Sequence, residues 1–337
     1  MKLIFQRNIA KSQATLPVVG VIALVLWFVL PTSHLSPLAS LSSCGLWCWV
    51  PPFLQEGYWG LSISLFCAAL AVYIMAELNN AYVLLRVSSR MLSSTLALLL
   101  ALVVSFHRFQ PGSLLLLFYL LSLFPLFASY QMPSPLFSFL THLMAATSSL
   151  VFPMLLWTIP LYWIAQAHFR TLTWRCFIAS LLGILVPYWL YGGVAIITDS
   201  LNRFVAHVSV VAHFQWADYT QLNLCDVLVF VFVLVLFVSG TIDYFINRFY
   251  DKTRVRLSFN MVVIHGIGMI LFIALQPQYV QHLLPLLLID TAMVFGHFFT
   301  LTHTKFTHIY SLILLVLALA LVAIQSAPQL LLGGIGS

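Results

Sequence analysis

The chain has 337 residues, of which 62% are hydrophobic and only 7% are charged. A water-soluble protein of ordinary composition has about a quarter charged residues, so this composition excludes a water-soluble fold and predicts an all-α, polytopic membrane protein. The net charge of +6 does not indicate nucleic-acid binding, because Lys and Arg residues that flank apolar segments mark the cytoplasmic side of a membrane.

Eleven apolar stretches follow one another along the chain, most of them close to the roughly 20 residues that a membrane-crossing helix needs. Unbroken apolar runs such as residues 227–238 favour helices over barrel strands, whose residues alternate. The sequence therefore predicts one transmembrane domain over residues 1–337, with outer interfacial segments at 32–58 and 198–224. The predicted spans are residues 15–31, 59–78, 92–106, 113–130, 136–150, 151–167, 176–197, 225–245, 259–275, 283–300 and 309–326.

The distribution of basic residues sets the predicted orientation. With the N-terminus inside and eleven spans, twelve Lys and Arg residues fall on the inner side and two on the outer side, as cytoplasmic loops require. The apolar run 136–167 decides this count. If it formed one long kinked helix, six Lys and Arg residues would fall on the inner side and eight on the outer side. We therefore predict two short spans joined by a tight outer turn near residues 148–153, and a C-terminus on the outer side.

The first outer segment is rich in aromatic residues, which is typical of a membrane–water boundary. It also holds Glu56, its lone acid, and the cysteines Cys44 and Cys48. The outer side is oxidising in most compartments, so a local disulfide suits this position, but the sequence leaves that bond open. No histidine cluster accompanies the two cysteines, so no zinc site is predicted.

The second outer segment predicts an amphipathic helix over residues 199–214. Its apolar residues fall on one face, and Arg203 and His207 lie four residues apart on the polar face. Two interpretations fit: a helix that lies flat on the outer leaflet, or a lid over a site, with Arg203 facing a cavity beside the first outer segment. Asp218 follows in the next loop, and Arg108 is the other outer arginine.

Ionisable residues within a span point to function, because burying them in a membrane is costly. Asp290 lies midway along its predicted span, and His265 lies at a matching depth in the preceding span. His297 follows Asp290 by two turns on the same face. The sequence predicts a buried His265–Asp290 pair, and both a structural pair and a proton relay fit it. We favour the structural pair, because nothing else in those helices suggests a substrate path.

Residues 169–175, Phe-Arg-Thr-Leu-Thr-Trp-Arg, with Gly183 and Pro187 after them, resemble a poorly characterised family of bacterial multi-spanning inner-membrane proteins. The family also has an Asn-Asn pair after its second span, as at residues 79–80, and an Arg-Ser-type helix start, as at residues 89–90. The resemblance covers residues 60–195 and carries over no catalytic residues.

The architecture is also similar to that of lipid-linked glycan polymerases and glycosyltransferases. The similarity implies that acids and arginines of short outer loops hold a polyprenyl-phosphate donor. Many such glycosyltransferases have an acidic pair in the first outer loop, whereas this chain has Glu56 alone there.

Three functions follow as hypotheses for a protein of the bacterial inner membrane and cell envelope. The first is an enzyme that acts on a lipid-linked glycan at the outer leaflet. In that case Arg108 and Arg203 would hold the diphosphate, and Glu56, His207 or Asp218 would act as the general base.

The second hypothesis is a non-catalytic assembly factor or subunit of an envelope complex, and the third is a carrier of a small or lipidic solute. His265 and Asp290 are the indication for the carrier. Enzymatic activity stays open, and no cofactor or metal is predicted, because the sequence has no phosphate-loop, HExxH or GxSxG motif. Expected partners are membrane lipids, and further candidates are a polyprenyl-phosphate-linked substrate or other envelope proteins.

Overall fold

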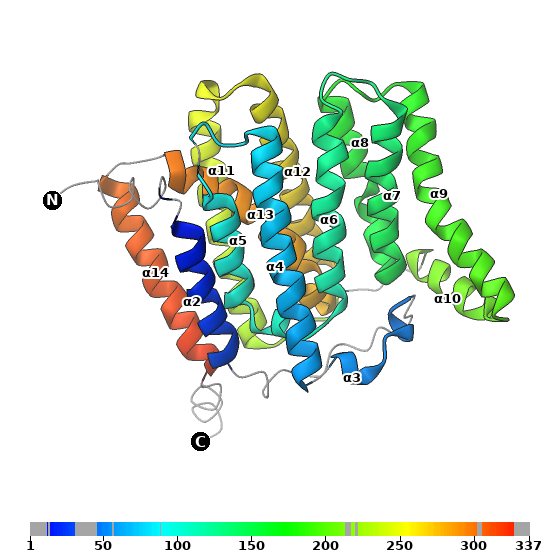
Figure 1. The fold of residues 1–337 in the computed structure, drawn as a ribbon, viewed down its shortest axis with the longest axis horizontal. Helices are drawn as coiled ribbons and strands as arrows, with labels where there is room; N and C mark the ends of the chain where they lie inside the picture. The colour runs from blue at the N-terminus through cyan, green and yellow to red at the C-terminus, as the bar shows by residue number, and fades with distance from the viewer. Residues whose placement is uncertain are drawn as a thin grey trace.

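The computed structural model describes residues 12, 14–30, 46–55, 57–87, 89–212, 217–219, 222–301 and 305–326. Within this part of the chain all regular secondary structure is helical, so the predicted all-α class is confirmed (Figure 1). The α-helices are α2 (Thr15–Val29), α3 (Pro52–Gln55), α4 (Gly57–Tyr82), α5 (Met91–Leu102), α6 (Pro111–Ala128), α7 (Pro135–Val151), α8 (Ile159–His168), α9 (Trp174–Ile197), α10 (Leu201–Ala212), α11 (Leu224–Asn247), α12 (Thr253–Leu275), α13 (Val280–Leu301) and α14 (Lys305–Ser326). Short 3-10 helices are η1 (Leu46–Trp49), η2 (Val104–His107), η3 (Pro153–Thr158), η4 (Arg248–Tyr250) and η5 (Pro277–Tyr279).

Most of the long helices run side by side, so their connections gather at two ends of the bundle (Figure 1). One end holds the α4–α5, α6–α7, α8–α9 and α11–α12 connections. We call it the basic end, because it carries Arg86, Arg90, Arg170, Arg175, Arg248, Lys252, Arg254 and Arg256. The opposite end holds α3 and α10, and we call it the α10 end. A one-sided distribution of basic residues is typical of helical membrane proteins.

Seven helical segments of the described chain are long and apolar enough to cross a membrane. They are Gly57–Tyr82, Pro111–Ala128, Trp174–Ile197, Leu224–Tyr250, Thr253–Leu275, Pro277–Leu301 and Thr307–Ser326. The other four predicted spans correspond to α2, α5, α7 and α8, which have 10 to 17 residues, fewer than the roughly 20 that a span needs. The count of eleven crossings and the orientation therefore stay predictions.

The hairpin predicted in residues 136–167 is present as a reversal of chain direction. The side-chain Nε2 of Gln166, near the end of α8, donates a hydrogen bond of 3.1 Å to the hydroxyl oxygen of Ser138, near the start of α7. This contact requires the two helices to run in opposite directions. Pro153 begins η3 at the turn, where a proline has no N–H for a continuing helix. One continuous kinked helix over this stretch is therefore wrong.

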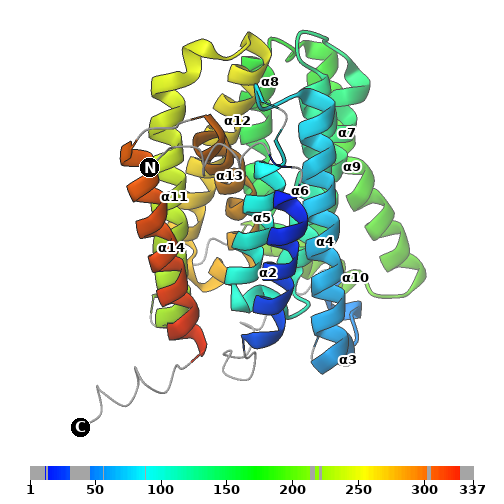
Figure 2. The same cartoon turned by 60° about the vertical axis from the view of Figure 1, so that its left-hand side comes forward.

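α13 is the central helix of the bundle. It packs against α5, α6, α11 and α12, which surround it in Figure 2. Among the most apolar 18 residues of Pro277–Leu301, which contains α13, 89% are buried, against 17% for Thr307–Ser326 of α14. A Cβ at Gly240 of α11 would lie 3.0 Å from backbone atoms of α13, so this small residue permits close helix packing. Any side chain that α13 presents near its middle is consequently enclosed by protein.

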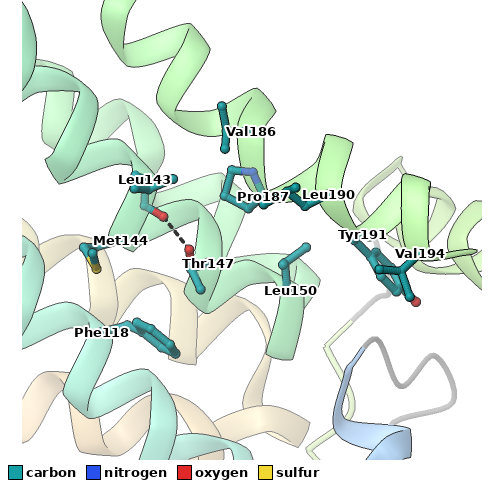
Figure 3. A pocket seen from close by; sticks show the side chains of 10 residues that line it. All are labelled: Phe118, Leu143, Met144, Thr147, Leu150, Val186, Pro187, Leu190, Tyr191 and Val194. Atoms are coloured by element: carbon teal, nitrogen blue, oxygen red, sulfur yellow. Dashed lines mark hydrogen bonds between the residues drawn. The ribbon is translucent and has the colours of Figure 1, made fainter.

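α9 packs tightly on α7 near its start and leans away from the bundle toward the α10 end (Figure 1). A Cβ at Gly183 would lie 2.5 Å from the carbonyl oxygen of Phe139, so only glycine fits at this contact. The divergence leaves a groove of about 370 Å³, which we call the α7–α9 groove (Figure 3). It is lined by Phe118, Leu143, Met144, Thr147, Leu150, Val186, Pro187, Leu190, Tyr191 and Val194.

A second groove of similar size, about 380 Å³, lies between α2, α4 and α5. We call it the α2–α4 groove. It is lined by Leu16, Pro17, Gly20, Val21, Ala23, Leu24, Trp27, Leu65, Ala68, Ala69, Val72, Ala97 and Leu100. Both grooves follow the sides of helices and are almost entirely apolar.

Candidate functional site

The structure brings His265 and Asp290 together inside the bundle. The Nδ1 atom of His265 lies 2.7 Å from Oδ2 of Asp290, and both side chains are at most 1% exposed. The hydroxyl group of Tyr119, on α6, donates a hydrogen bond of 2.6 Å to Oδ1 of Asp290. Both carboxylate oxygens therefore have a partner, as burial of an ionisable group requires.

The positions of this pair in the sequence explain why the two side chains meet. His265 lies ten residues before the end of α12 at Leu275, and Asp290 lies ten residues after the start of α13 at Val280. The helices are antiparallel neighbours joined by the short turn η5. Equal separations from the turn place both residues at one depth, because each helical residue advances about 1.5 Å along the axis.

Aromatic and hydroxyl side chains surround the pair. The ring of Tyr119 stacks on the ring of His265, with centroids 4.2 Å apart and planes 14° apart. The ring of Tyr162, from α8, lies 6.2 Å from that of His265, and its hydroxyl lies 3.2 Å from Oγ of Ser122. We call Tyr119, Ser122, Tyr162, His265 and Asp290 the central network. It joins four helices and holds three kinds of proton-binding group: a carboxylate, an imidazole and phenols.

His297 contacts a different acid, at the basic end. Its Nε2 atom lies 3.2 Å from Oδ2 of Asp251, and both side chains are buried. Arg86 donates to the other oxygen of the same carboxylate and, over 3.2 Å, to the backbone carbonyl of Asn247. We call Arg86, Asp251 and His297 the basic-end cluster. It ties the α4–α5 connection to the α11–α12 connection and to α13.

The charge of Asp251 is stabilised by this cluster. Burial alone would raise the pKa of Asp251, but the hydrogen bonds and charges of His297 and Arg86 outweigh burial, so its pKa lies below the usual value. Arg254 adds a second tie nearby, since it donates over 3.2 Å to the backbone carbonyl of Phe127 on α6. The basic end is thus held by charged contacts between segments far apart in the sequence.

Of the residues predicted for the lipid-diphosphate site, Arg108, Arg203 and Asp218 lie at or near the α10 end. Glu56 lies outside the described residues. Arg108 follows η2 and is half-buried. Asp218 is half-buried, and its backbone N–H lies 3.5 Å from the side-chain oxygen of Gln278. Arg203 is exposed, and its guanidinium makes no hydrogen bond or ion pair with a described residue. The contact with another outer loop that the lid interpretation requires of Arg203 is therefore not seen among the described residues.

His207 does not share the environment of Arg203, although a helical spacing of 100° per residue places both on one polar face. Its side chain is 1% exposed and packs against Tyr188 and Tyr191 of α9, with ring centroids 6.0 and 5.5 Å away. Both ring nitrogens are covered by protein, and the hydrogen-bonding group that acts on the ring is the backbone of Ser149. Burial lowers the pKa of His207 to about 4, so the ring is neutral at neutral pH.

The apolar face of α10 points largely outward. Leu201, Val205 and Val208 are exposed, while Phe204 packs against Tyr191 on the same side as His207. An exposed apolar face suits a helix at a lipid surface rather than one in water. The predicted helix is thus present, and the side that contacts protein is the one that carries His207.

Sequence reasoning missed Tyr119, Tyr162 and the partners of Asp251. The two tyrosines lie within apolar helices of a chain that has 13 tyrosines, and nothing in their spacing separates them from other core aromatics. Arg86 and Asp251 lie 165 residues apart, so only their common placement on the predicted inner side could have suggested that they meet. The intramembrane acid Asp290, by contrast, is a signal in the sequence itself.

Within the described residues, no three His, Cys, Asp or Glu side chains lie together so that they could hold a metal ion. The cysteines Cys44 and Cys48, whose disulfide the sequence left open, are outside the part of the chain for which side chains are described. Comparison of the chain with protein-family models, with curated proteins and with solved structures finds no match. The arrangement of its own residues is therefore the basis for a functional proposal.

Proposed function

We propose that the protein is a membrane carrier of a small solute whose movement is coupled to protonation of the central network. The observation that carries this proposal is a carboxylate, Asp290, that is fully buried on the central helix and bonded to His265 and Tyr119. Ionisable groups within membrane helices are rare, and they recur in proton relays of pumps and transporters.

The cost of the arrangement supports a role beyond packing. A buried ion pair is seldom more stable than apolar side chains of the same volume, because desolvation offsets the attraction between the charges. A bundle that needed only stability would be served as well by leucine at both positions. A pair of groups that exchange a proton, however, provides two charge states that a carrier can use.

Further ionisable groups lie above and below Asp290 on the same central helix. His282 is eight residues before it and His297 is seven residues after it, and both are buried. At 1.5 Å per residue these separations are about 12 Å and about 10 Å along the axis. Direct hydrogen bonds cannot span such gaps. Proton transfer between Asp290 and either histidine therefore requires intervening water or a helix movement, and a helix movement is what a carrier is expected to make.

We also propose that the bundle crosses a bacterial inner membrane eleven times, with the basic end in the cytoplasm. The gathering of arginine and lysine at one end supports this orientation. The four helices shorter than a full span would cross with the help of 3-10 segments and protein neighbours. α8, for example, continues η3.

Action on a lipid-linked glycan and a role as an envelope-complex subunit stay predictions. The exposed position of Arg203, without a bond to another described loop, gives the glycan hypothesis no support. An envelope-complex subunit would need no ionisable network inside the bundle, so the central network favours the carrier.

The test is solute uptake into liposomes that contain the purified protein. A mixture of metabolites is supplied under an imposed pH gradient, and the vesicle contents are identified by mass spectrometry. We expect at least one solute to accumulate with the wild-type protein and not with Asp290→Asn. The control is Thr291→Val, because Thr291 is buried beside Asp290 but bonds only to its own helix at Leu287. Accumulation no greater than in empty liposomes would reject the carrier.

Infrared difference spectroscopy tests the proton step separately. If Asp290 exchanges a proton, a carboxylic-acid band should titrate in the wild-type protein, disappear in Asp290→Asn and persist in Thr291→Val. A wild-type protein without such a band would mean that the pair is structural.

A further inference from the structure

His142, on α7, is a fully buried histidine with one unused ring nitrogen. Its Nδ1 atom lies 2.9 Å from the backbone carbonyl oxygen of Ser138. A carbonyl oxygen can only accept a hydrogen bond, so Nδ1 carries the hydrogen and Nε2 of the neutral ring is an acceptor. Nε2 is buried and has no hydrogen-bond partner among the described residues. Leaving a buried acceptor unsatisfied costs free energy, so a bound donor is indicated at this nitrogen.

Tyr162 connects His142 to the central network. The centroid of its ring lies 6.0 Å from that of His142 and 6.2 Å from that of His265. The Tyr162 hydroxyl lies 3.2 Å from Oγ of Ser122, and the Ser122 hydroxyl already donates to the backbone carbonyl of Tyr119 at 2.7 Å. A hydroxyl has one hydrogen, so Tyr162 is the donor to Ser122, and the lone pairs of the Tyr162 oxygen stay available to accept.

A water molecule is the ligand that suits these two groups. Nε2 of His142 and the phenol oxygen of Tyr162 both accept, so neither can serve the other, whereas one water can donate a hydrogen to each. Buried waters commonly join polar groups that are otherwise unsatisfied. An anion has no hydrogen to donate, and no group of described side chains here could hold a metal ion.

Polar side chains continue from His142 to the basic end. Ser138 lies one turn closer to that end on α7, and its hydroxyl accepts a hydrogen bond of 3.1 Å from Gln166 of α8. Thr171, in the α8–α9 connection, donates over 3.1 Å to the backbone carbonyl of Gln166. These three side chains are buried, while Arg170 beside them is exposed. We call Thr171, Gln166, Ser138, His142 and Tyr162 the α7–α8 line.

The other histidines near Asp290 lack such intermediates. His282 lies about 12 Å from Asp290 along α13, and the ring that packs on it belongs to Phe152, which cannot carry a proton. His297 lies about 10 Å away on the other side and is bonded to Asp251. The α7–α8 line, by contrast, has Tyr162 between His142 and the central network.

We propose that water bound to Nε2 of His142 links it to Tyr162, and that His142 relays protons between the basic end and Asp290. Nε2 takes a proton from water on the side of the basic end, the ring becomes a cation that keeps its Nδ1–H bond to Ser138, and Nε2 then releases the proton to the water beside Tyr162. The relay rests on the proposed function, because it requires Asp290 to exchange a proton.

The surroundings of His142 suit this role. The rings that pack on it are those of Tyr162 and Trp163, with centroids 6.0 and 6.2 Å away, and of the two only Tyr162 is titratable. On the α9 side it meets Gly183, which has no side chain. No described carboxylate, lysine or arginine contacts the ring, so no fixed charge holds it in one protonation state.

The test is the rate at which Asp290 exchanges its proton. Full-length protein in micelles is mixed rapidly with buffer of a different pH, and the carboxylic-acid band of Asp290 is followed by time-resolved infrared spectroscopy. His142→Asn is the decisive variant, because the asparagine amide can keep the bond to Ser138 while Nε2 is lost. A positioned acid–base group typically contributes about 10²–10⁴-fold to a proton-transfer rate, so exchange should slow at least about 100-fold. The pH midpoint of the band should stay unchanged, whereas a merely structural role would leave the rate intact.

His107 provides the matched control. It is also fully buried, one ring nitrogen lies 3.1 Å from the backbone carbonyl oxygen of Ala101, and the other has no described partner. Its ring stacks on Trp27, and none of its described contacts is with the central network. His107→Gln can keep the bond to Ala101, and it should exchange the Asp290 proton at the wild-type rate.

Three results would overturn the relay: an unchanged rate in His142→Asn, equal slowing in His107→Gln, or slowing in His282→Asn alone. If His142→Asn fails to fold, Tyr162→Phe replaces it, and an unchanged rate in that variant would overturn the proposal instead. A wild-type protein without a titrating Asp290 band would reject the proton-coupled carrier itself, so the two failures are distinguishable.

Discussion

Loss of His265 should destabilise the protein mainly by leaving Asp290 without its partner. His265→Ala removes the 2.7 Å contact with the carboxylate, and both side chains are at most 1% exposed. Removing one member of a buried pair costs about 3–5 kcal/mol, because the remaining group stays buried and unpaired. Part of this cost is the cavity that the missing imidazole ring leaves.

A double-mutant cycle separates the contact from the cavity. In an Asp290→Asn background the same His265→Ala change leaves the same cavity but no carboxylate. We expect the cost of His265→Ala to be smaller there by about 1–3 kcal/mol, because an unpaired buried amide costs less than an unpaired buried carboxylate. Tyr119 keeps its acceptor in both backgrounds, because an amide oxygen replaces Oδ1.

The assay is reversible unfolding in mixed micelles, followed by tryptophan fluorescence. Thr291→Val serves as the matched control, with an expected cost below about 1.5 kcal/mol, since it removes one local hydrogen bond. A coupling energy within about 0.5 kcal/mol of zero would mean that His265 and Asp290 act independently. That result would refute the paired arrangement and, with it, the proposed proton site.

Three further predictions concern other parts of the bundle. The lowered pKa of Asp251 means that its stabilising effect is present above the unfolded-state pKa of about 3.9 and is lost as the pH falls below it. The stability difference between the wild type and Asp251→Asn, measured by thermal unfolding, should therefore shrink in acid, and a difference that grows would contradict this. Gly183→Leu should cost about 1–3 kcal/mol, the usual cost of overpacking, because its Cβ would lie 2.5 Å from a backbone oxygen. Gly193→Leu, whose Cβ meets no atom within 4 Å, is the control. A reporter fused after Ser337 should read extracytoplasmic, and a cytoplasmic signal would reject either the eleven crossings or the inner N-terminus.

Local patterns in the sequence predict those features of the fold that depend on residues close together in the chain. Apolar runs predicted the helices, and the count of basic residues on each side predicted the α7–α8 hairpin, whose turn contains Pro153. The similar depth of His265 and Asp290 followed from their positions in two neighbouring spans that were expected to be antiparallel. These features depend on residues close in sequence, where helix geometry fixes position.

Features that depend on distant segments or on the solvent could not be predicted in the same way. Tyr119 meets Asp290 from a helix 171 residues earlier, and no spacing rule connects them. The helical spacing of apolar residues predicted an amphipathic α10, but an apolar face can point either to a protein core or to lipid. The structure turns His207 inward and leaves Val205 outward, which a rule derived for water-soluble helices does not anticipate.

The enclosure of α13 has a consequence for biogenesis. A lone helix with an aspartate at its centre enters the bilayer at a cost of about 2.5–3.5 kcal/mol for that residue, and α13 also carries His282 and His297. Its neighbours α11 and α12 are made before it, and α12 offers His265 at the matching depth. Insertion of α12 and α13 as one hairpin, with the aspartate already bonded to the imidazole, avoids exposing the acid to lipid. A ribosome stalled before Val280 would accordingly leave a membrane intermediate in which His265 has no acid to bind.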